Sequence, residues 1–498
     1  MSFEERFSDE IYLAKLSEFR NLGKDVIVAP YFKTKDQDKI GLSNFFYVKL
    51  KELSDTILLR REAEREHAVI AYQSDVHLWF VLSVSEKSRY NAMELANQFY
   101  ESKLFQYAEP DLLIDDIIDC ANDPHFGLQW GLRNIGQSGG TSGVDIKICD
   151  AWQLSTGSNV TVAVVDHGIY LSHPDLAANI HPFSYDSESK TSPQQLLGYH
   201  GTACAGIIGS LRNNIVNSNY VGIAGVAPNC KIMSISNSLA GSVLSREARA
   251  DGIDKARING ADVISNSWSW TPTAPLQIVS DAISNAVSLG RGGKGCIVVF
   301  SSGNNTASSV NFPGNLANVI AVGNITRIGS RDNTSNYGDA LNVTAPGTNS
   351  YSTDWQGGYA NFGGTSAACP HVAGIAALIL SINPNLTTQQ VQNIIESTAQ
   401  ELPNYPPNNP ARPNWNNQVG YGLVNAYAAI QEAICLLPVN FTNQIVIADT
   451  TVTSCGNINV QNVKVQNGAK LTLDAGGEVN IISDFEVESG SEFEIVYP

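Results

Sequence analysis

The 498-residue sequence is short of basic residues, with 31 lysines and arginines against 48 aspartates and glutamates and a formal net charge of −17. Proteins that bind nucleic acids hold the phosphates with clustered Lys and Arg side chains, and no such cluster occurs here. The composition therefore argues against a nucleic-acid partner.

Long apolar runs are also missing. A membrane-spanning helix needs about 20 consecutive, predominantly apolar residues, and no stretch approaches that length without interruption. The polar start MSFEER, residues 1–6, lacks the basic-then-apolar layout of a signal peptide. We therefore expect no membrane span, and a chain that either is not exported or was trimmed before residue 1.

Cysteine is scarce and scattered. The 8 cysteines form no CxxC pair, which argues against a zinc site, and their pairing cannot be read from the spacing. Cys204 and Cys369 fall inside predicted buried helices, so we expect both to be free thiols that pack as small hydrophobic residues.

The chain is long enough for about three domains. Residues 45–114 alternate as strand, helix, strand, strand, helix and strand, the order of a ferredoxin-like α+β unit. A charged connector follows at residues 115–124, and exposed tethers of this kind are preferred cleavage sites. The sequence therefore predicts an N-terminal α+β domain on a cleavable connector.

The region after the connector alternates apolar strands with helices. The expected strands are 160–165, 231–235, 262–264, 296–300 and 319–322, and the expected helices between them are 201–211, 246–259 and 276–289. Strands that are apolar on both faces indicate a parallel sheet covered by helices on both sides. Ligands of such sheets gather at the carboxyl ends of the strands.

The last residues differ in pattern. A loop rich in Pro and Asn at residues 403–417 interrupts the α/β region, and a helix at 424–436 closes it. Beyond Pro438, the segment 463–473 recurs as 485–495, which is typical of one rung of a β-solenoid or one hairpin of a β-sandwich. This repeat is either an attachment or stabilising domain or an extension of the preceding domain.

One stretch carries a candidate nucleophile. Small residues lead from Phe362 to Ser366, and an apolar run of helical length follows as far as Ile382. Ser366 would then begin a buried helix, where free backbone N–H groups and the positive end of the helix dipole can hold an oxyanion. Pro370 suits a first turn. The alternative is a glycine-rich turn before an ordinary core helix.

A serine nucleophile needs a base, and the base needs a carboxylate to fix its tautomer. His200 opens an apolar helix, as Ser366 does, whereas His371 belongs to the serine helix itself and fits a packing role. Asp166 ends the strand 162–165 and is placed to be the orienting carboxylate. A turn aspartate at the end of a strand is the simpler alternative.

Four segments together resemble the signature blocks of the subtilisin-like serine peptidases. They are VVDHGI (164–169), HGTACAG (200–206), SSGN (301–304) and GTSAACPHVAG (364–374), in that family's order of Asp, then His, then Ser. The resemblance covers about residues 125–436, and the preceding α+β unit resembles the family's inhibitory propeptide.

The resemblance assigns roles to single residues. It implies that Ser366 is the nucleophile, His200 the general base and acid, and Asp166 the orienting group, with Asn304 donating its amide to the oxyanion. His167 stands where relatives have Ser or Thr, and Ala203, Cys204 and Cys369 also depart from the commoner residues. None of these departures removes a catalytic atom, but Cys204 or Cys369 could make the enzyme sensitive to thiol reagents.

The family often binds a structural calcium ion through an aspartate of the first block and an asparagine-rich loop before a Gly-Val-Ala-Pro sequence. Here Asp175 and the loop 213–219 precede GVAP at 225–228, and they offer the oxygen atoms that Ca²⁺ prefers. The resemblance implies that Asp175 and Asn219 are metal ligands, although the loop departs from the usual length and sequence.

Substrate contacts follow from the same resemblance. Ser267, Trp268 and Ser269 resemble the segment that lines the first specificity pocket and pairs with the substrate as a β-strand. Nothing nearby offers an acidic selector for basic side chains.

The sequence therefore predicts an α/β protein with a subtilisin-like catalytic domain at 125–436, a ferredoxin-like prodomain and connector at 1–124, and a small all-β repeat domain at 437–498. The expected function is a serine endopeptidase that acts on proteins or peptides and is made as an autoprocessed zymogen inhibited by its own prodomain. Family resemblance places it outside the cell or at the cell surface. An inactive binding or adhesion protein on the same scaffold is the alternative. An esterase is disfavoured, because Ser366 lacks a Gly-x-Ser-x-Gly elbow.

Overall fold

The computed structural model describes residues 31–33, 39–73, 78–85, 87–114, 120–241, 243–271 and 276–496. The chain divides into two compact units, Met1–Asp119 and Cys120–Pro498, and each is described by itself. Residues 115–119 of the expected connector lie outside the described residues.

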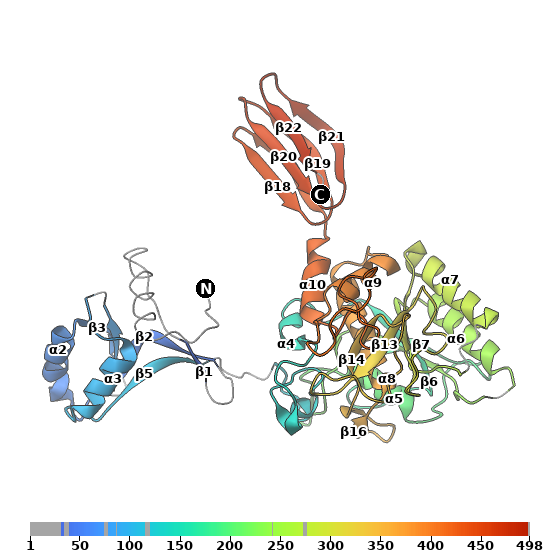
Figure 1. Ribbon diagram of the computed structural model, residues 1–498, viewed down its shortest axis with the longest axis horizontal. Helices are drawn as coiled ribbons and strands as arrows, with labels where there is room; N and C mark the ends of the chain where they lie inside the picture. The colour runs from blue at the N-terminus through green and yellow to red at the C-terminus, as the bar shows by residue number, and fades with distance from the viewer. Residues whose placement is uncertain are drawn as a thin grey trace. The chain divides into compact units, whose positions relative to one another are not determined.

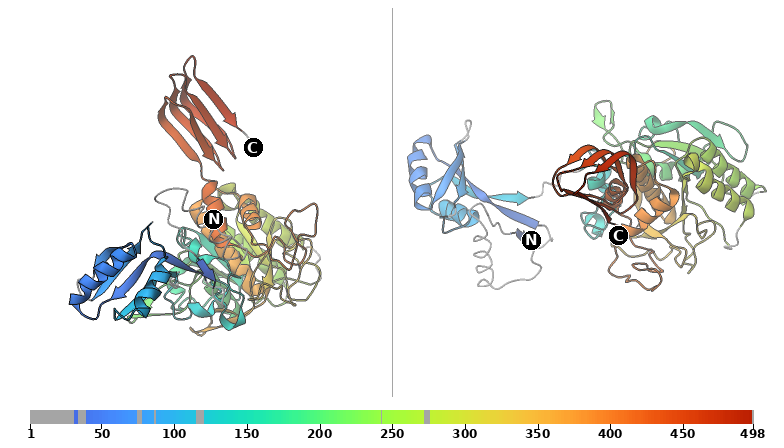
Figure 2. Two further views of the ribbon diagram at one scale, coloured as in Figure 1. Left: turned by 60° about the vertical axis from the view of Figure 1, so that its left-hand side comes forward. Right: turned by 90° about the horizontal axis from the view of Figure 1, so that it is seen from above.

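The first unit has the predicted ferredoxin-like order. Its elements are β1 (Tyr31–Lys33), β2 (Lys39–Lys49), α2 (Thr56–Arg65), β3 (Ala68–Gln73), β4 (Trp79–Val84), α3 (Ala92–Glu101) and β5 (Tyr107–Ile114). The antiparallel sheet has β2 at its centre, between β4 and β5. Phe46, Leu82 and Phe99 belong to the core between the sheet and the two helices, which lie on one face of the sheet (Figure 2). The unit therefore has a hydrophobic core of its own.

The second unit is built on a seven-stranded parallel sheet. Its order is β14 (Val343–Pro346), β13 (Ile320–Ile325), β12 (Ile297–Ser301), β11 (Val263–Asn266), β6 (Thr161–Asp166), β10 (Lys231–Ser236) and β7 (Ile180–Asp186). All five strands expected from the sequence are present. The two edge strands, β7 and β14, were not predicted, because His181 and Pro182 interrupt the apolar pattern of the first and the second has only 4 residues.

Helices cover both faces of this sheet (Figure 1). One face packs on α5 (His200–Gly209), α8 (Thr365–Ile382), α9 (Thr388–Ser397) and α10 (Ala426–Cys435). The other face packs on α6 (Ser245–Ile258) and α7 (Gln277–Gly293). Alternate residues of β6 divide between the two cores, with Val162 and Val164 in the first and Ala163 and Val165 in the second. The predicted α/β class with a doubly covered parallel sheet is therefore confirmed.

The central helix α8 runs through the larger core. By length and composition alone it could cross a membrane, but 89% of it is buried inside the protein. Its apolar sequence is thus satisfied by packing against the sheet and α5. Smaller elements of this unit are α4 (Ile148–Ala151), the hairpin of β8 (Ile215–Val216) and β9 (Asn219–Tyr220), and the hairpin of β15 (Ser350–Thr353) and β16 (Tyr359–Phe362).

The C-terminal residues form two layers of parallel strands, and the labelled strands can be followed in Figure 1. One layer is β17 (Val439–Val446), β19 (Ile458–Val465) and β21 (Val479–Val487); the other is β18 (Thr450–Ser454), β20 (Lys470–Ala475) and β22 (Glu492–Val496). The sequence repeat pairs in register, with Val463 opposite Phe485 and Leu471 opposite Phe493. Of the two expected patterns, the repeat therefore forms rungs of a β-solenoid and not a hairpin.

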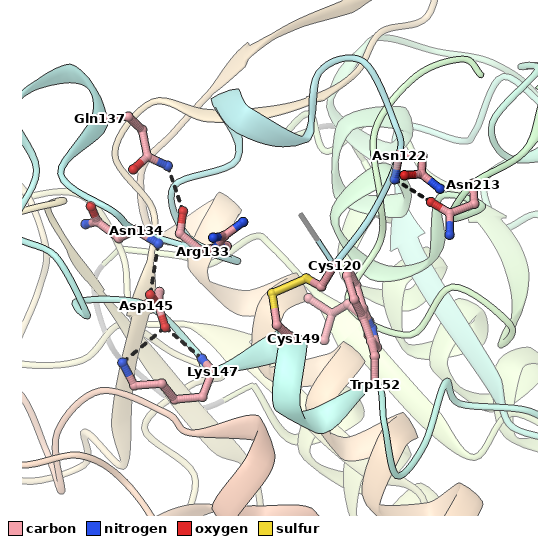
Figure 3. The surroundings of a disulfide bond; sticks show 11 residues. Cys120, Asn122, Arg133, Asn134, Gln137, Asp145, Lys147, Cys149, Trp152 and Asn213 are labelled. Atoms are coloured by element: carbon pink, nitrogen blue, oxygen red, sulfur yellow. Dashed lines mark hydrogen bonds and ion pairs between the residues drawn. A yellow bond between two sulfur atoms is a disulfide. The ribbon is translucent and has the colours of Figure 1, made fainter. Parts of the chain in front are cut away.

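Two disulfides tie segments of the second unit. Cys435, at the end of α10, is bonded to Cys455. Cys120, which lies within the expected connector, is bonded to Cys149 of α4 and ties the described end of that connector to this unit (Figure 3). The remaining cysteines, including Cys204 and Cys369, are buried free thiols, as predicted for those two.

Candidate active site

The predicted base and carboxylate meet at the carboxyl end of the central strand. Asp166 is the last residue of β6, and His200 is the first residue of α5. His200 Nδ1 lies 2.8 Å from Asp166 Oδ1 and 2.9 Å from Oδ2, while the His167 backbone N–H donates to Oδ1 at 2.7 Å. A carboxylate can only accept, so in the neutral form of His200 the imidazole proton is on Nδ1 and Nε2 carries the free lone pair.

The charge balance at this pair favours a protonated imidazole. The Asp166 side chain is 1% exposed and that of His200 is 17% exposed. Burial lowers the pKa of His200, but the adjacent Asp166 carboxylate outweighs it, so the pKa lies well above the ordinary 6.5. His200 is therefore a stronger base than an exposed histidine.

Ser366 lies in the first turn of α8, where Gly364 precedes the helix with φ +80° and ψ −175°. Pro370 has no N–H to bond the Ser366 carbonyl four residues earlier. That carbonyl instead accepts from Ser267 Oγ at 2.9 Å and from Cys204 Sγ at 3.6 Å. The proline thus frees a helix carbonyl to fasten the serine turn to two neighbouring elements.

The Ser366 hydroxyl donates to the Ser267 carbonyl at 3.3 Å. Among the described residues, no hydrogen bond joins it to His200. The Phe362 ring packs edge-on against the His200 ring, with centroids 5.1 Å apart. Ser366, His200 and Asp166 therefore converge on one end of the sheet, with the hydroxyl rotated toward the β11 side.

The predicted oxyanion donor has a fixed orientation. Asn304 Oδ1 accepts from the Thr365 backbone N–H at 2.9 Å and from Thr365 Oγ1 at 3.0 Å. Because the amide oxygen is engaged twice, the Asn304 Nδ2 group is left to donate elsewhere. Thr365 was not singled out in the sequence, although its place beside Ser366 could have suggested it.

The predicted substrate segment follows β11. Ser267 holds the Ser366 turn, Trp268 donates its indole N–H to Val165 O at 2.9 Å, and Ser269 Oγ accepts from Asn311 at 3.2 Å. Arg249 of α6 is 2% exposed, and its guanidinium lies 5.1 Å from the Trp268 ring and 4.4 Å from that of Trp270. The sequence did not indicate that Arg249 packs against this predicted substrate segment.

Two thiols adjoin the site. Cys204 Sγ lies 4.0 Å from Asp166 Oδ2 and 3.9 Å from His200 Nδ1, and Cys369 Sγ lies 3.7 Å from Ser265 Oγ. Burial raises the pKa of both thiols, that of Cys369 to about 12. Because thiolates are the reactive form, these cysteines are poor nucleophiles at neutral pH.

A second cluster of polar groups lies around the predicted metal ligand Asp175, which is fully buried. Asn214 Nδ2 donates to its Oδ1 at 2.9 Å, and the Ile223 backbone N–H donates to Oδ2 at 2.8 Å. Asp123, also buried, accepts from the Asn213 backbone N–H at 3.0 Å. The structure thus gathers Asp123, Asp175 and Asn214 around one loop.

Asn219 does not take the expected place beside Asp175. It is an exposed residue of β9, and its Nδ2 donates to Asn217 O at 3.0 Å. The loop 213–222 is long enough to form the β8–β9 hairpin, which carries Asn219 outward and leaves Asn214 at the carboxylate. From the sequence alone, the asparagine that lies beside Asp175 could not be told from the others in the loop. Nothing in the spacing of residues linked Asp123 to this loop.

The donor set around Asp175 fits a calcium ion. Asn214 Oδ1 is buried without a hydrogen-bond partner. Burial, with a contribution from the nearby Asp123 charge, raises the pKa of Asp175 to about 7, and burial also raises that of Asp123. Two desolvated carboxylates and an unpartnered amide oxygen are the hard ligands that Ca²⁺ takes.

Known proteins are similar to this chain in sequence and in structure. The family described as "Subtilase family" (Peptidase_S8) matches residues 157–422, more than half of the chain. Thermitase of Thermoactinomyces vulgaris is 33% identical over 314 residues, which are 62% of this chain and 99% of thermitase. A solved protease of Pseudoalteromonas arctica PAMC 21717 is 29% identical, with a TM-score of 0.51, covering 63% of this chain and 99% of that one.

A longer relative is named a calcium-dependent protease. This protein, from Nostoc sp. (strain PCC 7120), is 31% identical over 401 residues, which are 70% of this chain and 58% of the relative. The chain thus spans little more than half the length of that relative. The match over most of the parallel-sheet unit, together with the near-complete coverage of thermitase, establishes that the chain belongs to the subtilase family.

Proposed function

We propose that the protein is a serine endopeptidase that cleaves peptide bonds through an acyl-enzyme on Ser366. The observation that carries the proposal is the convergence of the Asp166–His200 pair with Ser366 at the N-terminal end of a buried helix. A catalytically inactive binding protein with the same fold would not need Asp166, His200 and Ser366 to lie together. Proteins and peptides are the proposed substrates, aligned along residues 267–269.

In the proposed mechanism, Ser366 Oγ turns from the Ser267 carbonyl toward His200 Nε2 when substrate binds. Nε2 accepts the hydroxyl proton as Oγ attacks the scissile carbonyl, and Asp166 stabilises the imidazolium through Nδ1–H. His200 then donates this proton to the leaving amine, leaving the acyl group on Ser366. A water attacks the ester by the same route, with His200 again as base and acid.

The oxyanion of each tetrahedral intermediate would lie between Asn304 Nδ2 and the backbone N–H of Ser366. Thr365 holds Asn304 Oδ1 from two donors, so the amide N–H group is oriented before the reaction begins. Donors fixed in this way need no reorganisation when the charge develops.

A calcium ion is proposed to stabilise the fold, held by Asp123, Asp175 and Asn214. It would neutralise two carboxylates whose burial otherwise disfavours their charge. The calcium-dependent relative supports this assignment. No catalytic step passes through the ion.

The proposed domains are a prodomain with its connector at residues 1–119, the catalytic domain at 120–436 and the solenoid at 437–498. Residues 120–124, which the sequence placed in the connector, are assigned to the catalytic domain because Cys120 is bonded to Cys149 and Asp123 is held by Asn213. The prodomain is proposed to inhibit the catalytic domain until it is cut off. Its sheet carries an apolar hollow on the face opposite the helices, lined by Tyr47, Tyr72, Trp79, Val81 and Glu109. Such an exposed aromatic face suits binding to another protein surface.

The two disulfides support a location outside the cell or at the cell surface, because disulfides persist in oxidising compartments. Secretion and surface exposure also suit a peptidase kept inactive by its prodomain during export.

Labelling by a fluorophosphonate probe and digestion of casein test the assignment together. The wild type should react with the probe and digest casein, and Ser366→Ala should do neither. Ser381→Ala, at the other end of α8, is the matched control and should behave as the wild type. Probe labelling that persists in Ser366→Ala would place the nucleophile elsewhere.

A further inference from the structure

His173 bridges Asp175, the proposed calcium ligand, to an element that leads into the active site. The Asp175 backbone N–H donates to His173 Nδ1 at 3.1 Å, and His173 Nε2 lies 2.9 Å from the Gly358 carbonyl oxygen. Because Nδ1 accepts, the ring proton is on Nε2 and is donated to Gly358. His173 is fully buried and its bond to Asp175 is made away from water, whereas Gly358 is half-buried.

Gly358 lies in the turn between β15 and β16. The strand after this turn runs from Tyr359 to Phe362, whose ring packs on His200 at 5.1 Å. The Tyr359 ring packs on His173 at 5.3 Å and on His125 at 5.2 Å. The turn of the hairpin therefore contacts His173, which is hydrogen-bonded to Asp175, and the end of the hairpin packs on His200, the predicted general base.

The same hairpin also holds the helix of His200. On β15, Ser352 Oγ donates to Ala203 O and Thr353 Oγ1 donates to Thr202 O, at 2.6 and 2.7 Å. A shift of the hairpin would thus move both the ring that covers His200 and the first turn of its helix. A packed hairpin of this kind transmits a displacement because it cannot deform continuously.

We propose that His173 is a positioning residue that couples calcium binding at Asp175 to the placement of Phe362 against the His200 ring. The inference rests on the proposed peptidase function and calcium site. Without the ion, the Asp175 carboxylate keeps its hydrogen bonds from Asn214 and Ile223 but loses the stronger metal contact, and His173 passes the added freedom of this turn to Gly358 and the hairpin. Calcium then affects kcat as well as stability, through the orientation of His200.

Two substitutions each remove one of the two hydrogen bonds of His173 and keep the other. An asparagine amide reaches the position of Nδ1, so His173→Asn keeps an acceptor for the Asp175 N–H and loses the bond to Gly358. A glutamine amide reaches the position of Nε2, so His173→Gln keeps the donor to Gly358 and loses the acceptor. His125→Phe is the matched control, because it keeps an aromatic ring against Tyr359 at another histidine of the cluster.

Calcium affinity is measured by indicator competition in a Ser366→Ala background, which prevents self-digestion. His173→Gln should bind calcium about 10- to 100-fold more weakly, the usual effect of losing a partner that orients a metal ligand. His173→Asn and His125→Phe should bind calcium as the unsubstituted protein does. Normal binding by His173→Asn also shows that this variant is folded.

Activity and the downfield NMR signal of the His200 Nδ1 proton are then followed during calcium titration. In the wild type, calcium should raise kcat by on the order of tenfold with little change in KM, and should shift the signal. In His173→Asn both responses should be much smaller despite bound calcium, with the Tyr359 hydroxyl, which is hydrogen-bonded to Asp175, left as the remaining link to the hairpin. A His173→Asn variant with the wild-type kcat response would overturn the coupling.

The outcomes also separate this inference from the function on which it rests. If the wild type binds calcium but neither kcat nor the NMR signal responds, the calcium site stands and the coupling is wrong. If the wild type binds no calcium, the proposed site and the coupling both fail, while the peptidase assignment is judged by the Ser366 variant alone.

Discussion

Asn304 and Thr365 are joined by two hydrogen bonds to one oxygen atom. The Asn304 Oδ1 atom accepts from both the backbone and the side chain of Thr365, at 2.9 and 3.0 Å. Since Thr365 immediately precedes Ser366, this pair fixes the amide of Asn304 relative to the nucleophile. The Asn304 Nδ2 group, proposed from a sequence motif as the oxyanion donor, is thereby held in one orientation.

Replacing Asn304 with leucine should therefore lower kcat by about 10²–10³ and leave KM nearly unchanged, because the amide acts only on the charge of the transition state. Thr365→Val, which removes one of the two bonds that orient the amide, should cost about 2- to 10-fold. Asn305→Leu is the neighbouring control. If Asn305→Leu costs as much and Asn304→Leu is silent, the donor has been assigned to the wrong residue.

The acid side of the pH profile should report His200. This residue must be neutral to accept the Ser366 proton, and its pKa is raised by Asp166. Activity should thus fall as pH decreases, with a midpoint in kcat/KM above the ordinary histidine value of about 6.5. Removing the Asp166 charge in Asp166→Asn should move the midpoint of the residual activity downward. An upward movement would show that another group controls this limb.

The buried His371 should make stability depend on pH. Its Nδ1 lies 2.8 Å from the Ala367 carbonyl oxygen, and burial lowers its pKa to about 4. Below about 6.5 the unfolded chain binds a proton that the folded chain rejects, so stability is complete above that pH and is lost as pH falls toward 4. The loss at pH 5 should be about 2 kcal/mol.

Urea unfolding of the Ser366→Ala protein in saturating calcium, at pH 7.5 and pH 5, measures this loss. His371→Gln, which cannot titrate, should show a correspondingly smaller difference between the two pH values. Equal differences in both proteins would mean that other groups cause the acid sensitivity.

Calcium should stabilise the fold through Asp175 and Asn214. An ion that binds only the folded state adds about 2.7 kcal/mol at a hundred times its Kd, so melting in excess calcium should exceed melting in EGTA. Asn214→Ser should reduce this increment, whereas Asn219→Ser should retain it, because Asn219 lies on the exposed hairpin. Identical melting temperatures in calcium and in EGTA would show that the protein has no such calcium site.

The parts of the structure that were predictable from sequence are those with strong local patterns. The apolar strands 160–165 and 296–300 sit beside long periodic helices, and Asp166 and His200 end and begin such elements. The repeat 463–473 indicated stacking, but its parallel register depends on pairing between distant rungs, which no local pattern encodes. Short edge strands such as β14 depend on their neighbours in the same way.

The parts that the sequence did not predict are contacts made across the fold. Asp123 lies on a segment with no periodicity. It meets the loop of Asn214 through hydrogen bonds between segments far apart in the sequence, among them those of Asn122 and Asp123 with Asn213. His173 was not singled out in the sequence, although its hydrogen bonds to Asp175 and Gly358 place it between two elements. Such contacts depend on tertiary closure, so spacing along the chain carries no signal for them.

The disulfide at Cys120 sharpens the prediction for prodomain removal. Cys120 is bonded to Cys149 and Asp123 is held by Asn213, so the part of the expected connector that begins at Cys120 is fastened to the second unit and is a poor cleavage site. The wild type should therefore be cut between residues 114 and 120, while Ser366→Ala stays full length. The released N-terminal fragment should inhibit the mature enzyme when it is added back.

Non-reducing electrophoresis and N-terminal sequencing distinguish the possible positions of the cut. Cleavage before Cys120 frees the N-terminal fragment without a reductant, because the disulfide then lies wholly within the mature chain. Cleavage after Cys120 would leave that fragment attached until the bond to Cys149 is reduced, and would contradict the assigned position. Active enzyme that still begins at Met1 would show instead that the α+β unit is a permanent accessory domain, since an inhibitor that blocked the site of Ser366 could not remain bound in a working peptidase.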